Sequence, residues 1–236
     1  MDVSVVTPYW NEALNLLERN VYSVATQKTK YKFEHLVVID NPNVSIEIIK
    51  YLHANQVPYK IHFQNAGLSA SRNSALERAS GKYIMILDTD DSFVEGRIET
   101  QINYMEENNY DHTYGGFQPI HGNSNTPEKE KVIPPEFSLD YLLDFNNICY
   151  CGSNCFKREV YEKIGGFDVN MKDGAEDLEY WIRIATNGYR VGLLPEVLYY
   201  LGITSHNMTA QYLAEGRFSK AYEYIRRKYP HLKFTT

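Results

Sequence analysis

The sequence predicts an α/β protein in which helices cover both faces of a mostly parallel sheet. Two observations support this prediction. Short apolar, β-favouring runs alternate with segments of helical periodicity, and one of these runs ends in a cluster of aspartates. Alternation favours parallel strands, because a crossover helix has to carry the chain back to the same end of the sheet. At 236 residues the chain is long enough for one large domain or two small ones.

The first half of the chain carries most of the alternation. The runs VSVVT, HLVVI and YIMIL predict buried strands, and Leu14, Leu17 and Val21 recur at helical spacing after the first of them. Pro8 is expected to end the first strand and Gly81 to follow the third helix. Strands are expected at residues 3–7, 35–39, 60–63 and 83–87, and helices at 14–27, 45–55 and from 69 onward.

The second half is less regular. Residues 115–135 are rich in Gly, Pro, Asn and charge, so we expect an exposed loop there. Gly188 is expected just after the end of a helix. The other predicted elements are helices at 138–144, 174–187 and 215–234 and a strand at 148–157.

Composition excludes some classes of function. A formal net charge of −6 and a pI near 5.7 argue against nucleic-acid binding, which needs a basic patch. No signal-peptide pattern and no apolar run long enough for a membrane helix is found, so a cytoplasmic protein is expected. Cys149, Cys151 and Cys155 are odd in number and lack zinc-site spacing, which predicts reduced structural thiols.

The run Lys82–Leu87 delivers Asp88, Asp90 and Asp91 to the end of a predicted strand. Carboxylates this close repel one another unless a cation neutralises them, and their hard oxygens suit Mg²⁺ or Mn²⁺ held jointly with substrate phosphates. Ligands bind at the C-terminal ends of strands in open α/β sheets, so we expect a phosphate-bearing substrate there. An acidic helix cap is the alternative. A calcium loop is disfavoured because Phe93 stands where that loop requires glycine.

Glycine-rich phosphate loops of the G-x-G-x-x-G and Walker types are absent, which argues against dinucleotide oxidoreductases and P-loop NTPases. Four other segments, in this order and spacing, resemble a family 2 inverting glycosyltransferase: VSVVTPYWNE (3–12), NAGLSASRNSALERASGKYIMILDTDDSF (65–93), KREVYEKIGGFD (157–168) and GAEDLEYWIRIA (174–185). The resemblance implies a GT-A fold, which is a Rossmann-like sheet with a smaller acceptor-side region. It also implies a nucleotide-sugar donor with Mn²⁺ or Mg²⁺, and transfer to an acceptor hydroxyl.

On this resemblance, residues 1–236 are expected to form a single domain. The parts are a nucleotide-sugar-binding half (1–110), an acceptor and catalytic half (111–208) and a C-terminal basic amphipathic helix (209–236).

The donor-side residues follow from the resemblance position by position. Arg72 would face the nucleotide, since a guanidinium suits base carbonyls or phosphate. Asn41 stands where the family often has an aspartate. It can still bind a base but carries no charge, so the preference for a UDP donor is weaker than usual. The nucleotide-sugar-binding set comprises Thr7, Pro8, Tyr9, Glu12, Asp40, Asn41, Arg72, Asp88 and Thr89.

The resemblance also assigns the metal ligands and the catalytic base. Asp90 would be the most direct metal ligand, with Asp88 beside it and His206 as a third candidate. Asp177 would take the proton from the acceptor hydroxyl, and the neighbouring catalytic-site residue Glu176 would raise its otherwise low pKa. The Q-x-x-R-W run of processive synthases is absent, so one transfer per binding event is expected.

Purely structural interpretations of these residues stay open. Thr7 would only end a strand, and Arg72 would pair with Glu77. The acids Glu176 and Asp177 would only stabilise the start of a helix. The rival functions are a sugar-nucleotide nucleotidyltransferase, for which the glycine-rich basic loop is missing, and a non-catalytic nucleotide- or carbohydrate-binding module.

The C-terminal segment mixes basic residues with aromatics, and Phe218, Tyr222, Ile225 and Tyr229 share one helical face. Such a helix either lies on an anionic membrane, at its inner face, or packs on its own domain. Membrane contact would suit a lipid-linked acceptor. The expected acceptor is a glycan or a lipid-linked saccharide in surface polysaccharide synthesis.

Overall fold

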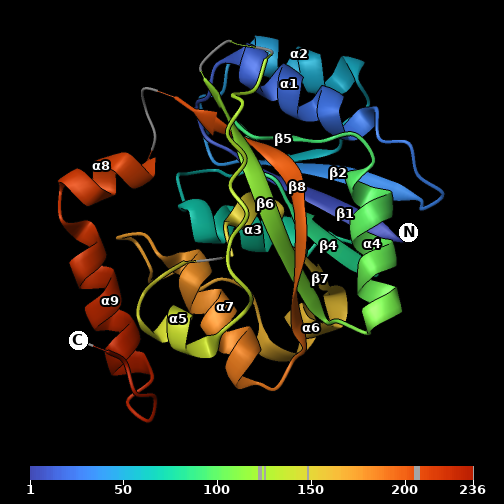
Figure 1. Cartoon of the computed structure of the whole chain (residues 1–236). Coiled ribbons are helices and arrows are strands. Elements are labelled where there is room, and N and C mark those ends of the chain that lie inside the picture. The colour runs from blue at the N-terminus through green and yellow to red at the C-terminus, as the bar shows by residue number, and fades with distance from the viewer. Residues whose placement is uncertain (122–123, 125, 148, 205–207, 236) are drawn as a thin grey trace.

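The computed structural model contains an eight-stranded sheet that passes through both halves of the chain (Figure 1). The structure describes residues 1–121, 124, 126–147, 149–204 and 208–235. Its strands are β1 (Val3–Tyr9), β2 (Phe33–Ile39), β3 (Tyr59–Ile61), β4 (Tyr83–Ile86), β5 (Ser92–Phe93), β6 (His112–His121), β7 (Cys155–Lys157) and β8 (Val191–Ile203). They are arranged in the order β3-β2-β1-β4-β7-β6-β8-β5.

The helices connect these strands and extend the chain beyond them. They are α1 (Leu14–Ala25), α2 (Ile46–Ala54), α3 (Leu68–Leu76), α4 (Arg97–Asn108), α5 (Leu139–Leu143), α6 (Arg158–Ile164), α7 (Glu176–Thr186), α8 (Met208–Ala214) and α9 (Arg217–Lys228), with a short 3₁₀ turn at Cys151–Ser153. Within the described parts of the chain, none of these helices combines the length and apolar character needed to cross a bilayer.

The predicted α/β architecture is confirmed. Strands β1 to β4 pair in parallel, β7 pairs antiparallel with both β4 and β6, and β8 runs parallel to β6. Alternate residues of β1 face opposite sides, because Val3 and Val5 pack with α4 residues whereas Val6 packs with residues of α3 and α7. Helices therefore cover both faces, and a site is expected at the C-terminal end of the parallel block.

The prediction that Pro8 ends the first strand was wrong. Strand β1 continues to Tyr9, with Pro8 opposite Val38 of β2. The ring is tolerated because β4 pairs with β1 only as far as Val6, so the missing N–H of Pro8 faces a side without a ladder partner. Instead, the Pro8 carbonyl on that side accepts a hydrogen bond from the Thr89 hydroxyl at 2.6 Å.

Three other local predictions were also wrong. Helix α3 ends at Leu76, and Gly81 instead allows close chain contact, since a Cβ there would lie 2.5 Å from the backbone nitrogen of Ser4. Residues 115–121 continue the long strand β6 rather than forming a loop. In the expected strand 148–157 only the last three residues are a strand, and residue 148 lies outside the described residues.

The C-terminal helix α9 packs its apolar face against the domain. Ile225 has 0% of its surface exposed, and Phe218, Tyr222 and Tyr229 pack around the same core cluster as α7. This is the packing arrangement that the sequence left as the alternative to membrane contact. Figure 1 shows α9 beside the α5–α7 side of the molecule, with α8 leading into it.

Candidate active site

An acidic cluster follows the end of β4. Asp91 is buried, and one of its carboxylate oxygens accepts a hydrogen bond from the Gly202 N–H of β8 at 2.9 Å. A Cβ on Gly202 would lie 2.0 Å from the Asp90 carbonyl oxygen, so β8 can approach this closely only with glycine there. On the opposite side, Arg19 of α1 donates to the same Asp90 carbonyl at 2.7 Å. Helix α1 and strand β8 thus hold the aspartate loop from both sides.

Arg72 of α3 connects this cluster to the second half of the chain. Its Nη2 atom lies 2.9 Å from both carboxylate oxygens of Asp88, and its Nη1 atom lies 2.6 Å from Oε1 of Glu176 in α7. Only 2% of the Arg72 surface is exposed. The alternative pairing with Glu77 is not what the structure has. The guanidinium is held by two carboxylates from distant segments, so its expected contact with the nucleotide would have to be shared with them.

The carboxyl groups of Asp90 and Glu12 are destabilised as anions. Burial, then the nearby charges of Asp88 and Glu12, raise the pKa of Asp90 to about 7. Burial also raises the pKa of Glu12, although the N–H groups of Trp10 and Asn11 donate to its carboxylate at 2.8 and 3.1 Å. Excess negative charge of this kind is what a divalent cation neutralises.

The residues present fit a hard divalent cation. Over the ranges that the structure describes, no three His, Cys, Asp or Glu side chains are grouped so that they alone could hold a metal ion. The oxygen donors Asp90 and Asp88 suit Mg²⁺ or Mn²⁺ bound by one or two carboxylates together with substrate phosphates. His206, the third candidate ligand, lies outside the described residues.

Asp177 occupies the first turn of α7, next to Glu176. Its carboxylate accepts hydrogen bonds from the Asn147 side-chain amide at 2.7 Å and from the Leu178 N–H at 2.8 Å. Burial, then the charge of Glu176, raise the pKa of Asp177 to about 6, while the positive charge of Arg72 limits the rise. A carboxylate with this pKa is a better proton acceptor than an exposed aspartate and is still ionised near neutral pH.

Several expected donor-side groups have other partners. The Thr7 side chain is buried, and its hydroxyl lies 2.9 Å from Nε2 of His35. The buried Tyr9 hydroxyl donates to the Glu12 carbonyl at 2.9 Å. Together with the buried bond from Thr89 to the Pro8 carbonyl described above, these contacts give the hydroxyl groups of Thr7, Tyr9 and Thr89 partners within the protein.

Asp40 and Asn41 follow the end of β2. The two carboxylate oxygens of Asp40 accept hydrogen bonds from the N–H groups of Ala66 and Gly67 at 2.8 and 2.7 Å. Nδ1 of His62 lies 2.7 Å from the same carboxylate. Asn41 accepts the Asn43 N–H at 2.9 Å in a local turn. Asp40 therefore fixes the chain that enters α3, and the amide of the half-buried Asn41 donates to the Asn11 side chain at 3.5 Å.

Sequence reasoning missed three supporting residues. Asn20 of α1 donates to the Asp88 carbonyl at 2.9 Å, Arg19 holds Asp90, and Asn147 holds Asp177. Asn20 could have been suspected, because a polar residue interrupts the apolar stripe between Leu17 and Val21. Asn147 lies in a loop and carried no such signal.

The family model described as "Glycosyl transferase family 2" matches residues 4–165. The chain belongs to glycosyl transferase family 2. This membership argues against the nucleotidyltransferase and the non-catalytic module that the sequence left open. The matched segment includes Arg72 and the aspartate cluster but ends before Asp177 and α9.

Named relatives of this family 2 glycosyltransferase span different lengths. It is 30% identical over 232 residues to an uncharacterized glycosyltransferase of Methanocaldococcus jannaschii, covering 94% of this chain and 77% of the relative. It is 29% identical to the minor teichoic acid biosynthesis protein GgaB of Bacillus subtilis, covering 91% of this chain and 24% of GgaB. It is also 29% identical to the Escherichia coli UDP-Glc:alpha-D-GlcNAc-diphosphoundecaprenol beta-1,3-glucosyltransferase WfgD, covering 65% of this chain and 57% of WfgD.

Solved structures confirm the predicted GT-A fold. Staphylococcus aureus TarS in complex with UDP-GlcNAc superposes with a TM-score of 0.64 at 20% identity, over 86% of this chain and 59% of that one. The Pyrobaculum calidifontis mannosyltransferase PcManGT, in complex with GDP-Man and Mn²⁺, has the same TM-score and identity over 93% of this chain and 63% of that one. At this identity the likeness concerns the fold.

Proposed function

We propose that this family 2 glycosyltransferase moves one sugar per binding event from a nucleotide-sugar donor to a hydroxyl of a saccharide or lipid-linked acceptor, with inversion. The observation that carries the proposal is the Arg72 bridge. One buried guanidinium joins Asp88, at the end of β4, to Glu176, beside the candidate base Asp177. The metal-binding and proton-accepting groups of the reaction thereby become neighbours across the site.

On the donor side, Asp90 and Asp88 are the proposed ligands of Mn²⁺ or Mg²⁺, with His206 as a further candidate. The metal, when bound, stabilises the negative charge that develops on the leaving diphosphate. The buried partners of these residues keep the loop in place: β8 abuts Asp90 through Gly202, and Arg19 holds its carbonyl. Preorganisation of this kind lowers the cost of binding a charged group.

On the acceptor side, Asp177 is the proposed base. Asn147 and the Leu178 N–H orient its carboxylate, and a pKa of about 6 leaves it mostly ionised at pH 7. It takes the proton of the acceptor hydroxyl as the oxygen attacks the anomeric carbon, and the bond to the diphosphate oxygen breaks. General-base assistance of this type contributes roughly 10²–10⁴ in rate. Glu176, paired to Arg72, tunes Asp177 rather than accepting the proton itself.

UDP is the proposed nucleotide. WfgD is named for a UDP-Glc donor and TarS was solved with UDP-GlcNAc, whereas PcManGT was solved with GDP-Man. The names of GgaB and WfgD, which concern teichoic acid and a diphosphoundecaprenol-linked sugar, support a role in surface polysaccharide synthesis. With a lipid-linked acceptor of that kind, the enzyme would act in the cytoplasm, at the inner face of the membrane.

The test is calorimetric titration of UDP, GDP, dTDP and CDP, each with Mn²⁺ and with a chelator. The expected result is metal-dependent binding of UDP that is lost in Asp90→Asn and kept in Glu95→Gln, an exposed carboxylate paired with Lys28 at 2.7 Å. Binding that is equal with Mn²⁺ and with the chelator would reject the metal site. Binding of a different nucleotide alone would move the donor to that nucleotide's sugars.

A further inference from the structure

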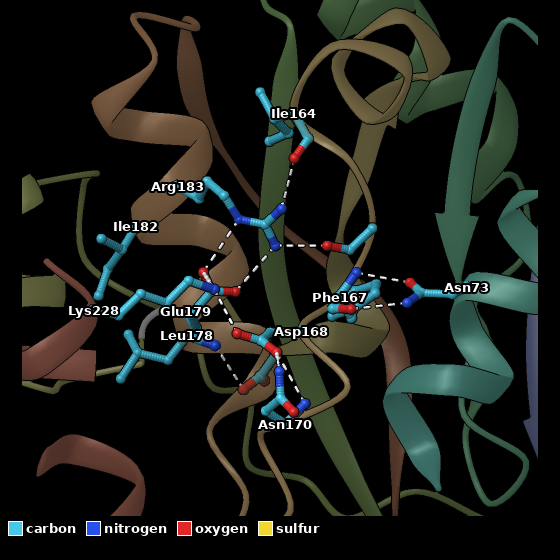
Figure 2. A network of polar contacts seen from close by, with 12 residues as sticks. Asn73, Ile164, Phe167, Asp168, Asn170, Leu178, Glu179, Ile182, Arg183 and Lys228 are labelled. Carbon is cyan, nitrogen blue, oxygen red and sulfur yellow. Dashed lines mark hydrogen bonds and ion pairs between the residues drawn. The ribbon is translucent and has the colours of Figure 1, made fainter. Parts of the chain in front are cut away.

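The helix that carries the proposed base has a second buried carboxylate, Glu179. None of its surface is exposed. Arg183, one turn along α7, binds it at 3.2 and 3.0 Å, Lys228 of α9 binds it at 2.9 Å, and the Tyr229 hydroxyl donates to it as well. Figure 2 shows Arg183 and Lys228 meeting at Glu179 from different elements.

Lys228 also reaches a second acid. Its Nζ atom lies 2.5 Å from Oδ2 of Asp168, in the loop that precedes α7. The residue before Asp168 is Phe167, whose backbone N–H and carbonyl both bond to the Asn73 side chain at 2.7 and 2.8 Å. Figure 2 shows the bonds between Asn73 and Phe167. Asn73 adjoins Arg72 in α3, so the contacts of Lys228 lead back to the Arg72 bridge.

These contacts anchor α7 at two places. Glu176 is held by Arg72, and Glu179, three residues later and therefore on nearly the same face, is held by Lys228 and Tyr229. Asp177 lies between the two anchors. A helix pinned at two points three residues apart can neither rotate about its axis nor slide, and either motion would displace the Asp177 carboxylate.

Lys228 is not needed merely to bury Glu179. Arg183 already pairs with that carboxylate and is itself fixed by the carbonyls of Ile164 and Gly166 at 2.7 and 2.6 Å. What Lys228 adds is a connection between α9 and α7. Lys228, Tyr229 and their acidic partners Asp168 and Glu179 lie beyond residue 165, where the match to the family model ends, so family membership does not assign these contacts.

We propose that Lys228, assisted by Tyr229, is a positioning residue: its ion pairs with Glu179 and Asp168 make the C-terminal helix a clamp that aligns Asp177 with the acceptor hydroxyl. The proposal rests on the proposed function of Asp177. Misplacement of a reacting group by about 1 Å can cost roughly 10²-fold in rate, so a clamp distant from the chemistry has a measurable effect.

The test compares Lys228→Met with Arg227→Met. Arg227 is the adjacent residue of α9, is 75% exposed in its side chain and pairs with Glu223 of the same helix, so its variant loses the same charge without removing a described contact to α7. UDP release from UDP-GlcNAc with Mn²⁺, with water as the acceptor, reports turnover. Amide hydrogen exchange in the first turn of α7 reports the clamp without turnover.

We expect Lys228→Met to lower kcat by roughly 10-fold or more, with an unchanged donor KM and faster exchange in the first turn of α7. Arg227→Met should match the wild type, and Lys228→Arg should recover most of the rate because arginine also binds two carboxylates. Equal kcat and equal exchange in the Met variants at 227 and 228 would overturn the proposal. So would a Lys228→Met variant that changes only the KM of the donor.

Asp177→Asn separates this proposal from the one on which it rests. An inactive Asp177→Asn with an unimpaired Lys228→Met rejects the clamp alone. A fully active Asp177→Asn rejects the base, and the clamp with it.

Discussion

The acidic residues on the donor side and those on the acceptor side differ in how their charge is compensated. On the donor side, Glu12, Asp90 and Asp91 all have raised pKa values, although Arg19 donates to the Asp90 carbonyl, and the Arg72 guanidinium is bound to Asp88. On the acceptor side, Glu176 is paired with Arg72, and Asp177 receives two neutral hydrogen bonds. The donor side thus keeps uncompensated negative charge that suits a cation, whereas the acceptor side keeps one carboxylate poised to take a proton.

Arg72 is the residue that the two sides share, so its loss should have the largest effect. Arg72→Met leaves Asp88 and Glu176 without their common partner, and breaking a buried ion pair costs about 3–5 kcal/mol. We expect a lower unfolding midpoint in urea and no detectable transfer. Arg78→Met, at an exposed arginine just after α3, serves as the control and should unfold at the wild-type midpoint. A stable Arg72→Met enzyme would mean that the two sides are independent.

Asp90→Asn should raise thermal stability relative to the wild type without metal and lower it when Mn²⁺ and UDP are present. Because the pKa of Asp90 is raised to about 7 in the fold, its ionisation opposes folding at higher pH, and this cost is fully present above pH 7. At pH 8 with a chelator the variant should therefore melt at a higher temperature than the wild type. With Mn²⁺ and UDP the wild type should gain stability and the variant should not. If the variant melted at a lower temperature than the wild type in chelator, the ionised Asp90 carboxylate would not be a cost to the fold.

The acceptor side should control the pH dependence of turnover. Asp177 has a pKa of about 6 and must be ionised to accept a proton, so kcat should fall about tenfold per pH unit below pH 6. The decline in kcat lies on the acid side because Asp177 becomes protonated as the pH falls through its pKa, and the protonated carboxyl group cannot accept a proton. A pH–rate profile measured at saturating donor checks this. A kcat that stays level down to pH 4.5 would exclude Asp177 as the base.

Asn147→Ala should give the smallest of these changes. The amide of Asn147 donates to the Asp177 carboxylate, and losing one hydrogen bond to a charged group costs about 1.5 kcal/mol. The acid limb of the profile should therefore move up by about one pH unit. Asn146→Ala, at the exposed neighbouring asparagine, should leave the limb in place. A limb that moves down instead would mean that Asn147 does not stabilise the ionised form.

Local sequence signals predicted the parts of this molecule that depend on neighbouring residues. Strand-helix alternation indicated the sheet, and the aspartates after β4 indicated where the candidate site lies. The partners of buried polar groups could not be predicted, because they come from far along the chain: Glu176 is 104 residues from Arg72, and Gly202 is 111 residues from Asp91.

The same reasoning explains the errors in the fold. Proline was expected to end β1, but whether a strand tolerates it depends on which neighbour pairs at that residue, and this is a tertiary property. Glycine and proline suggested a loop near residue 115. Instead, Gly115 and Gly116 lie within β6 where it packs closely on neighbouring chain, since added Cβ atoms would approach Leu198 and Val132.

The division of roles between the two sides is tested most directly by Asp177→Asn, assayed for donor binding and for transfer in the same preparation. Calorimetry with UDP-GlcNAc and Mn²⁺ measures binding, and UDP release measures turnover. The division predicts wild-type donor affinity with turnover reduced by roughly 10²-fold or more. Wild-type turnover, or a loss of donor binding equal to the loss of turnover, would contradict it.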